Sequence, residues 1–184
     1  GSVEQGHTIE LAEKVFALIE PFAGYGFPKA HAVSYALISY WTAYLKANYP
    51  SEYMVCLLNA YSGNTEKLAL SVAECSRLKI PVLHPDINHS EEEFVAERCE
   101  DGTIAIRFGL GAIKNVGVSG LSPIIGGREG NGSFESLEHM CKVADMGALN
   151  RKALESLIMA GAFDEFGDRA ALLDSAGRIL SVAQ

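Results

Sequence analysis

The sequence predicts a mainly α-helical protein that contains one small β-hairpin. Apolar residues recur at helical spacing along most of the chain, capping and turn residues separate these stretches, and a single stretch alternates as a β-strand does. The 184 residues are 48% hydrophobic and 21% charged, a composition typical of a chain that folds around a core.

Two long helices are expected first. Between Thr8 and Phe22 the apolar side chains share one face, and Glu10 lies in the first turn, where the helix dipole favours a negative charge. Two glycines and a proline follow at residues 24–28. A second helix with a broad apolar face then runs until Pro50, which is expected to end it.

Two shorter helices come next. Ser51 is a candidate cap for a helix through Leu58, and Asn64 is a candidate cap for the following helix. In that following helix four apolar residues share a face, namely Leu68, Val72, Cys75 and Leu78. The pattern turns to that of a strand from Ile80 to Leu83.

The β-hairpin is expected where residues 94–98 and 103–108 flank Asp101-Gly102, a dipeptide typical of tight turns. Just before it, Ser90 and Glu93 have the spacing of a capping box, which predicts the start of a helix at the acidic run. A soft domain boundary is expected near Asn88.

From Gly109 onward the sequence predicts short helices separated by glycine turns. An exposed loop is expected at residues 126–132, and Asn150 is expected to cap a helix that extends to Ala160.

Charge and hydropathy indicate which classes of function are less compatible with this sequence. The net charge of −8 opposes binding to nucleic acid through a general positive field, but between Ile104 and Arg128 all three formal charges are positive. No run of about 18 apolar residues and no leader-like start is found, so a cytoplasmic protein without a membrane partner is expected. The start at Gly1-Ser2, without Met, suggests an internal piece of a longer chain.

The first candidate site is the start of the second helix. Backbone N–H groups and the positive end of the helix dipole favour a phosphate there, Lys29 would add a charge, and His31 would add a donor. Tyr35 lies one turn beyond His31 on the same side. The alternative is that Lys29 is a solvated surface charge, that His31 is a histidine with satisfied hydrogen bonds, and that the glycines only form a turn.

The second candidate site lies between Ala112 and Ile124, and it resembles the helix-hairpin-helix pattern. A turn without bulky side chains lets backbone N–H groups and a helix N-terminus meet a DNA phosphate without reading a base. Asn115 stands where the pattern usually has its first glycine, and asparagine tolerates a left-handed backbone. The candidate backbone-binding residues are Lys114, Asn115, Val116, Gly117, Val118, Ser119 and Gly120. The alternative is a turn that only packs two helices together.

Two further groups of residues carry weaker signals. Residues 150–180 form a looser second copy of the pattern, but acidic residues oppose its basic ones, which indicates a packing role. His84, Asp86 and His89 are potential metal ligands, yet they stand among turn-forming residues without a further ligand set, so no metal site is assigned. The four cysteines include no CxxC pair, so neither a zinc ribbon nor a redox pair is expected.

Several stretches, in order, resemble the bacterial C-family replicative DNA polymerases. They are GYGFPKAHAVSYALISYWTAYLKANYPSEY from Gly24, NTEK from Asn64, VLHPDIN from Val82, IRFGLGAIKNVG from Ile106 and AGAFD from Ala160. One departure is Pro28, where many family members have asparagine, so a contact made by that amide would be missing.

The resemblance implies a helical fingers segment at residues 1–88, followed by the β-hairpin and a tandem helix-hairpin-helix DNA-binding segment at residues 89–184. It implies that Lys29, His31 and Tyr35 contact the incoming deoxynucleoside triphosphate, and that duplex DNA, the rest of the polymerase chain and other replicase subunits are partners. The parent would be a DNA-directed DNA polymerase with Mg²⁺ in its palm, while this piece would hold no catalytic residue and no cofactor. The alternative is a non-catalytic helical module that binds other proteins.

Overall fold

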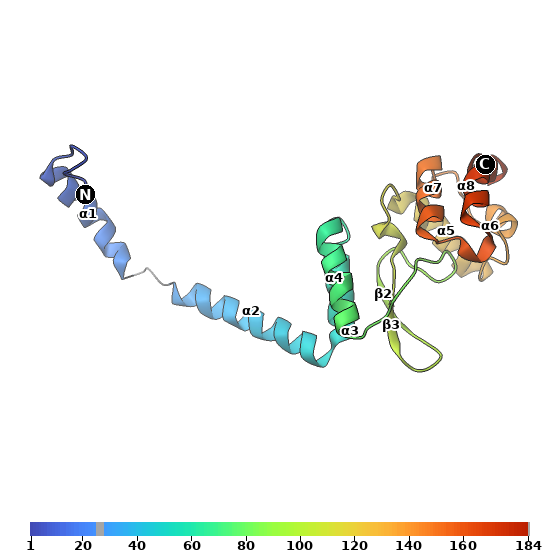
Figure 1. The fold of residues 1–184 in the computed structure, drawn as a ribbon, viewed down its shortest axis with the longest axis horizontal. Helices are drawn as coiled ribbons and strands as arrows, with labels where there is room; N and C mark the ends of the chain where they lie inside the picture. Colours follow the sequence, from blue (N-terminus) through green and yellow to red (C-terminus); the bar gives the residue numbers. More distant parts are fainter. Residues whose placement is uncertain (25–27, 184) are drawn as a thin grey trace. The chain divides into compact units, whose positions relative to one another are not determined.

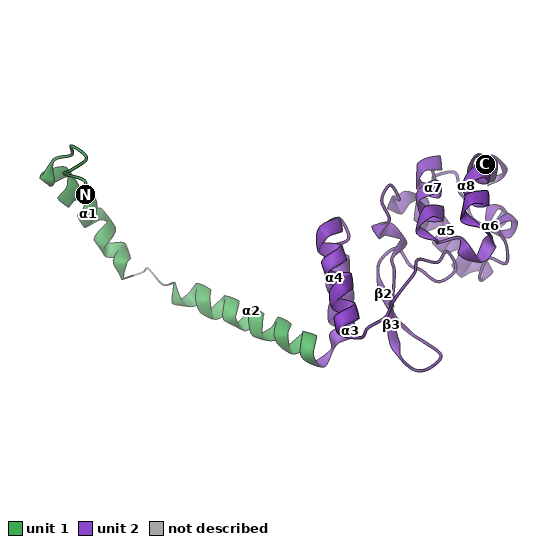
Figure 2. Ribbon diagram, viewed as in Figure 1, with its two compact units in different colours: residues 1–47 green, residues 48–184 purple. Residues whose placement is uncertain are grey.

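The computed structural model describes residues 1–24 and 28–183. The chain divides into two compact units, Gly1–Ala47 and Asn48–Gln184 (Figure 2), which are described here one at a time. Within the described residues, no helix is both long enough and apolar enough to cross a bilayer.

The first unit contains α1 at Ile9–Ala23 and all but the last residue of α2 at Lys29–Asn48 (Figure 1). Thr8 caps α1, because its side-chain oxygen accepts a hydrogen bond from the backbone N–H of Leu11 at 3.2 Å. Both helices were predicted. Of the predicted segment between them, residues 25–27 lie outside the described part.

The apolar side chains of this first unit are largely exposed. Phe16 is 65% exposed, Phe22 71% and Trp41 55%. In neither α1 nor α2 is any residue buried among those described. The two helices therefore carry apolar faces without a core of their own in this chain.

The second unit begins with α3 at Pro50–Ala60 and α4 at Thr65–Arg77. The prediction that Ser51 caps α3 was wrong, because Tyr49 occupies the capping position and Ser51 is buried inside the first turn. Pro50 begins α3, and its fixed φ suits a first helical residue. The predicted cap of α4 is confirmed, since Asn64 accepts a hydrogen bond from the N–H of Lys67 at 3.0 Å.

Three short strands form one sheet in the order β1-β3-β2, with β1 at Val82–Leu83, β2 at Val95–Arg98 and β3 at Ile104–Arg107. The predicted hairpin is confirmed, because β2 and β3 pair antiparallel, whereas β1 pairs with β3 in parallel. The sheet packs on α3 and α4 around a small core, which consists of Met54, Leu58, Cys75, Ile80, Phe94 and Ile106.

A larger core lies among the C-terminal helices. These are the 3-10 helix η1 at Leu110–Ala112, α5 at Val118–Asn131, α6 at Leu137–Val143, α7 at Arg151–Ala160, the 3-10 helix η2 at Asp164–Phe166 and α8 at Arg169–Ala183. Helices α7 and α8 lie side by side, and α6 contacts both α5 and α8 (Figure 1). The mainly α fold with a small sheet is as predicted.

The predicted helix start at Ser90 is wrong. The Ser90 hydroxyl is occupied, because it accepts a hydrogen bond from the backbone N–H of Asp86 at 2.9 Å. The carbonyls of Glu91 and Glu92 accept hydrogen bonds from the N–H groups of Leu110 and Gly111, both at 2.9 Å. The acidic run is therefore a bent, non-helical segment whose backbone is hydrogen-bonded to η1.

The predicted loop at residues 126–132 is also wrong, since α5 continues to Asn131. Tertiary contacts outweigh the low helix propensity of its glycines. Arg128 has a side chain that is only 10% exposed, and it donates hydrogen bonds to the carbonyls of Ile87 and Ser90 at 3.2 and 2.8 Å. Its guanidinium also lies 2.7 Å from the carboxylate of Glu91.

Asn88, near which a domain boundary was predicted, lies inside the second unit. Its side chain is joined to the backbone of Phe134 by two hydrogen bonds of 2.8 and 3.0 Å. The division of compact units falls instead at residues 47 and 48. Whether function divides near Asn88 stays a prediction.

Candidate nucleic-acid interface

The turn between η1 and α5 contains a left-handed residue. Asn115 has φ of 70°, a conformation that asparagine tolerates better than most side chains, as the sequence predicted. The N–H of Val116 then donates to the carbonyl of Ile113 at 3.1 Å, which closes the turn. The chain thus reverses direction before α5 begins.

Helix α5 begins without a side-chain cap. Gly117 occupies the capping position in an extended conformation, with φ −102° and ψ 151°, and having no side chain it makes no capping hydrogen bond. The first backbone N–H groups of a helix have no acceptor within the helix, and they add to the positive end of its dipole. This end of α5 is therefore suited to an anion such as a phosphate.

The seven predicted backbone-binding residues divide by exposure. Val116 is half-buried against the larger core, and Gly120 is buried with its N–H donating to the carbonyl of Gly117 at 3.0 Å. The other five are exposed, namely Lys114, Asn115, Gly117, Val118 and Ser119. The exposed five are the ones that solvent or a ligand can reach.

Gly120 allows close packing behind the hairpin. A Cβ added at this position would lie 3.1 Å from Cδ1 of Leu149 and 3.5 Å from the carbonyl oxygen of Ala148. Because Leu149 is itself buried, α5 is held close to the segment that precedes α7. Gly120 thus contributes to packing at this point.

The Asn115 side chain connects the turn to α7. Its Nδ2 donates a hydrogen bond to Oγ of Ser156 at 3.1 Å, and the Ser156 hydroxyl donates in turn to the carbonyl of Lys152 at 2.8 Å. Ser156 is buried, so this contact fixes the turn against the interior of the unit. Sequence reasoning did not include Ser156, and no local pattern indicates it.

The charges around the N-terminus of α5 are less positive than the sequence predicts. Glu92 and Glu93 line the same small cavity as Val118, the first residue of α5. Arg128 is paired with Glu91, and Arg107 with Glu97 at 2.8 Å. Lys114, which is exposed, therefore supplies the accessible positive charge of the hairpin.

In the second hairpin, formed by α7 and α8, Arg151 and Arg169 are in ion pairs, whereas Lys152 is exposed. Arg151 lies 2.8 Å from Glu155. Arg169 donates from Nε to Asp164 at 2.7 Å, and this hydrogen bond lowers the pKa of the Asp164 carboxyl. Gly161, with φ of 92°, ends α7 in the left-handed conformation. This arrangement agrees with the packing role expected for these residues.

The sheet and the two hairpins together match a known protein family. The family model described as the helix-hairpin-helix motif matches residues 79–172, more than half of the chain. The chain belongs to the helix-hairpin-helix motif family. The matched range includes the sheet, the turn at Asn115 and both hairpins up to the start of α8.

Three relatives of this helix-hairpin-helix chain share one name. It is 46% identical over 184 residues to DNA polymerase III subunit alpha of Escherichia coli (strain K12), and 46% identical over 167 residues to that of Saccharopolyspora erythraea. It is 45% identical over 175 residues to that of Thermus aquaticus. These matches cover 100%, 91% and 95% of this chain, which confirms the resemblance noted from its motifs. The chain spans only 14–16% of the length of these relatives.

The predicted nucleotide-binding residues precede the region of the helix-hairpin-helix match. Lys29, His31 and Tyr35 are exposed on α2, and the rings of His31 and Tyr35 lie 4.4 Å apart between centroids. Lys29 is the first residue of α2, so its backbone N–H is among those without an acceptor in the helix. The structure thus brings His31 and Tyr35 together.

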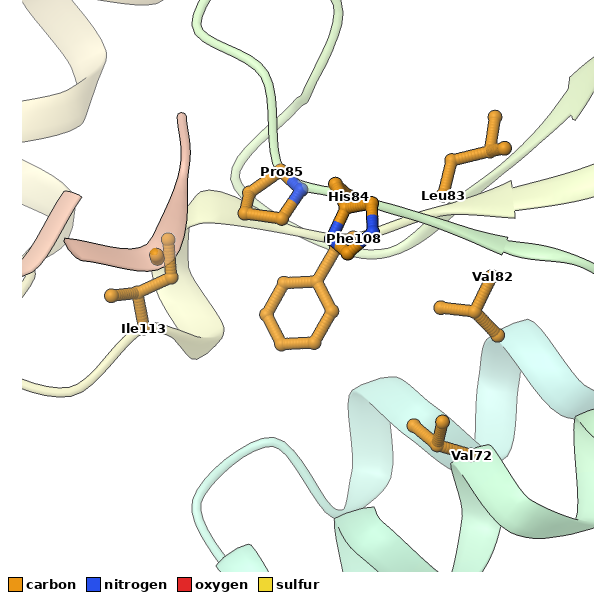
Figure 3. Close-up of a pocket in the computed structure, with 8 residues that line it drawn as sticks. Val72, Val82, Leu83, His84, Pro85, Phe108 and Ile113 are labelled. Carbon is orange, nitrogen blue, oxygen red and sulfur yellow. The ribbon is translucent and has the colours of Figure 1, made fainter. Parts of the chain in front are cut away.

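The helix-hairpin-helix chain also has an apolar cavity of about 450 Å³ beside the sheet (Figure 3). Its lining consists of Val72, Val82, Leu83, His84, Pro85, Phe108, Ile113 and Ala160. Among the described residues, His84 is the one ionisable residue in this lining, and no described residue of the predicted sites contributes to it. The cavity and the N-terminus of α5 are therefore separate features of the second unit.

Proposed function

We propose that this chain is the part of a bacterial DNA polymerase III alpha subunit that binds the backbone of duplex DNA without reading its sequence. The observation that carries the proposal is the start of α5, where an uncapped helix N-terminus follows a turn that has Asn115 in the left-handed conformation. Phosphate contacts position a protein on DNA but carry no sequence information, which suits a replicative enzyme.

The first unit supplies the second part of the proposal, contact with the incoming deoxynucleoside triphosphate. Lys29 and the free amides at the start of α2 offer positive charge and donors to a phosphate, while His31 and Tyr35 offer two neighbouring rings. This role rests on the resemblance of the segment around Gly24 to the fingers of C-family polymerases and on the exposure of these residues.

The parent protein would be a DNA-directed DNA polymerase that acts in DNA replication in the cytoplasm. Metal ions held by carboxylates would position the primer hydroxyl and stabilise the leaving pyrophosphate. The sequence contains no paired-aspartate segment of that kind, so we assign the Mg²⁺ to the palm of the parent and expect no polymerase activity from this chain alone. Other replicase subunits and the rest of the polymerase chain would be its partners.

Binding of fluorescein-labelled duplex DNA to the 184-residue chain, measured by anisotropy at several salt concentrations, tests the DNA-binding proposal. We expect weak binding that does not depend on base sequence and that falls steeply as salt rises, because phosphate contacts release counterions. Lys114→Ala should weaken binding to all duplexes and reduce the slope of log affinity against log salt by about 1.

Lys142→Ala is the matched control, because Lys142 is an exposed lysine on α6 that is paired with Glu138. It should leave the salt slope unchanged. Binding that is insensitive to salt, or equal loss of affinity in the Lys114 and Lys142 variants, would refute the role of the hairpin.

A second candidate function is supported by the exposed apolar faces of α1 and α2. A non-catalytic module that binds other proteins would present such faces to a partner. The reading frame of the parent gene discriminates between the two: a carboxylate pair in a palm upstream of this segment supports the polymerase, and its absence supports the module.

A further inference from the structure

Three potential metal ligands meet on the second unit, and none of them belongs to the turn at Asn115. One ligand atom each from Asp86, His89 and Glu165 lies within 4.8 Å of the others. Asp86 and His89 belong to the turn that follows β1, while Glu165 belongs to η2. The sequence indicated His84, Asp86 and His89 as potential ligands; His84 does not belong to this cluster, and the fold brings in Glu165 from a distant segment.

Asn88, a residue buried between these ligands, fixes both carboxylates. Its backbone N–H donates to Oδ1 of Asp86 at 2.7 Å, and its Nδ2 donates to Oε2 of Glu165 at 3.1 Å. Its own Oδ1 accepts the N–H of Phe134 at 2.8 Å, which holds the amide in this orientation. Each carboxylate keeps its second oxygen for a ligand, and partners that orient ligands in this way are typical of metal sites.

We propose that Asp86, His89 and Glu165 form a binding site for a divalent transition-metal ion of the zinc class. Three protein ligands with a water molecule complete a tetrahedral coordination sphere, and an imidazole ligand favours zinc over Mg²⁺ or Ca²⁺. Ligand atoms that share a zinc ion at about 2.0–2.2 Å lie roughly 3.3–3.6 Å apart. In the structure the three ligand atoms lie within 4.8 Å of one another, and rotation of the exposed side chains of His89 and Glu165 can bring them to the shorter separation.

The charges around the cluster leave it negative. Arg107 interacts electrostatically with Asp86, but its guanidinium is engaged by Glu97 through hydrogen bonds of 2.8 and 2.9 Å. Glu97 in turn interacts with His89. An added cation would offset the two ligand carboxylates, and it would connect the turn at residues 86–90 to η2.

Titration of the 184-residue chain with Zn²⁺, Co²⁺ and Mg²⁺, followed by calorimetry and by thermal unfolding, tests this site. We expect Zn²⁺ to raise the unfolding temperature and to bind more tightly than Mg²⁺. His89→Gln and Glu165→Gln should each weaken Zn²⁺ binding by at least about tenfold. Loss of a residue that only orients a metal ligand already lowers metal affinity by about that factor or more. Both residues are exposed, so the variants should fold, which circular dichroism checks.

His84→Gln is the matched control, because His84 is an exposed histidine in the same segment that lies outside the cluster. It should bind Zn²⁺ as the unaltered chain does. The Co²⁺ spectrum separates this site from the free cysteines, since thiolate ligands give intense charge-transfer bands and the proposed ligands do not. Thiolate bands, equal affinity in all four proteins, or tighter binding of Mg²⁺ than of Zn²⁺ would overturn the proposal.

Discussion

Nδ2 of Asn115 lies 3.1 Å from Oγ of Ser156, so the side chain of a left-handed turn residue is fixed to the middle of α7. The same residue thus satisfies two requirements, a positive φ and a contact across the unit. Glycine would meet the first requirement, but having no side chain it could not meet the second. The two requirements can be separated by substitution.

Asn115→Gly and Asn115→Ala should both destabilise the chain, and alanine should do so more. Each loses the hydrogen bond, which contributes about 1 kcal/mol, and alanine adds the cost of a left-handed backbone, about 1–2 kcal/mol. Urea unfolding gives both free energies. Equal stability of the two variants would show that φ at position 115 relaxes when the side chain is lost.

Two adjacent glycines of α5 should respond to alanine in opposite directions. At Gly126 no neighbouring atom of the described residues lies within 4 Å of an added Cβ, so alanine should stabilise the chain by about 0.5–1 kcal/mol through higher helix propensity. At Gly127 the added Cβ would lie 3.2 Å from Cα and Cβ of Ala144 and from the carbonyl oxygen of Val143, so alanine should destabilise it. Thermal unfolding of the pair measures the difference, and a stabilising Gly127→Ala would mean that α5 and the end of α6 move apart easily.

The Glu97–Arg107 pair should contribute to stability at neutral pH and lose that contribution in acid. The hydrogen bonds from Arg107 lower the pKa of the Glu97 carboxyl, so the folded state favours the ionised form. The stabilisation is complete above the pKa of an unfolded glutamate, about 4.3, and is lost as pH falls through the lower folded value. Between pH 7 and pH 3 the free energy of unfolding of Glu97→Gln should fall less steeply than that of the unaltered chain. Parallel pH profiles of the two proteins would show that this pair does not contribute to the pH dependence of stability.

In the full polymerase, Lys29→Ala and His31→Ala should raise KM for the incoming deoxynucleoside triphosphate. A hydrogen bond to a charged phosphate contributes about 1.5–3 kcal/mol, so each loss should cost on the order of tenfold or more in kcat/KM. Lys14→Ala, an exposed lysine on α1, is the control. Steady-state kinetics with unchanged values for both variants would remove these residues from the nucleotide site.

Local sequence rules predicted most of the secondary structure, because local hydrogen bonds determine where many of its helices begin. The caps at Thr8, Asn64 and Asn150 each accept an N–H from three residues ahead, and such a contact needs no knowledge of the rest of the chain. Ser90 has the same local spacing, but its hydroxyl is used by Asp86 within a turn that packs on distant residues.

In the candidate sites, too, some features follow from the local sequence and others depend on how distant segments pack. The left-handed conformation of Asn115 follows from its position in a motif and from the properties of asparagine. Its contact with Ser156 and the approach of Glu165 to Asp86 depend on how α7 and η2 pack, which one sequence does not specify. Likewise, Glu92 and Glu93 come close to the start of α5 only when the chain folds, since along the sequence they precede the positively charged stretch at residues 104–128.

The order β1-β3-β2 has a consequence for how the second unit folds. Only residues 99–103 separate β2 from β3, whereas residues 84–103 separate β1 from β3. Closing the shorter loop costs less conformational entropy, so the antiparallel hairpin can form as an early and independent event. The parallel pairing of β1 then follows, and it brings α4, which precedes β1 in the chain and contacts it, against a hairpin that already exists.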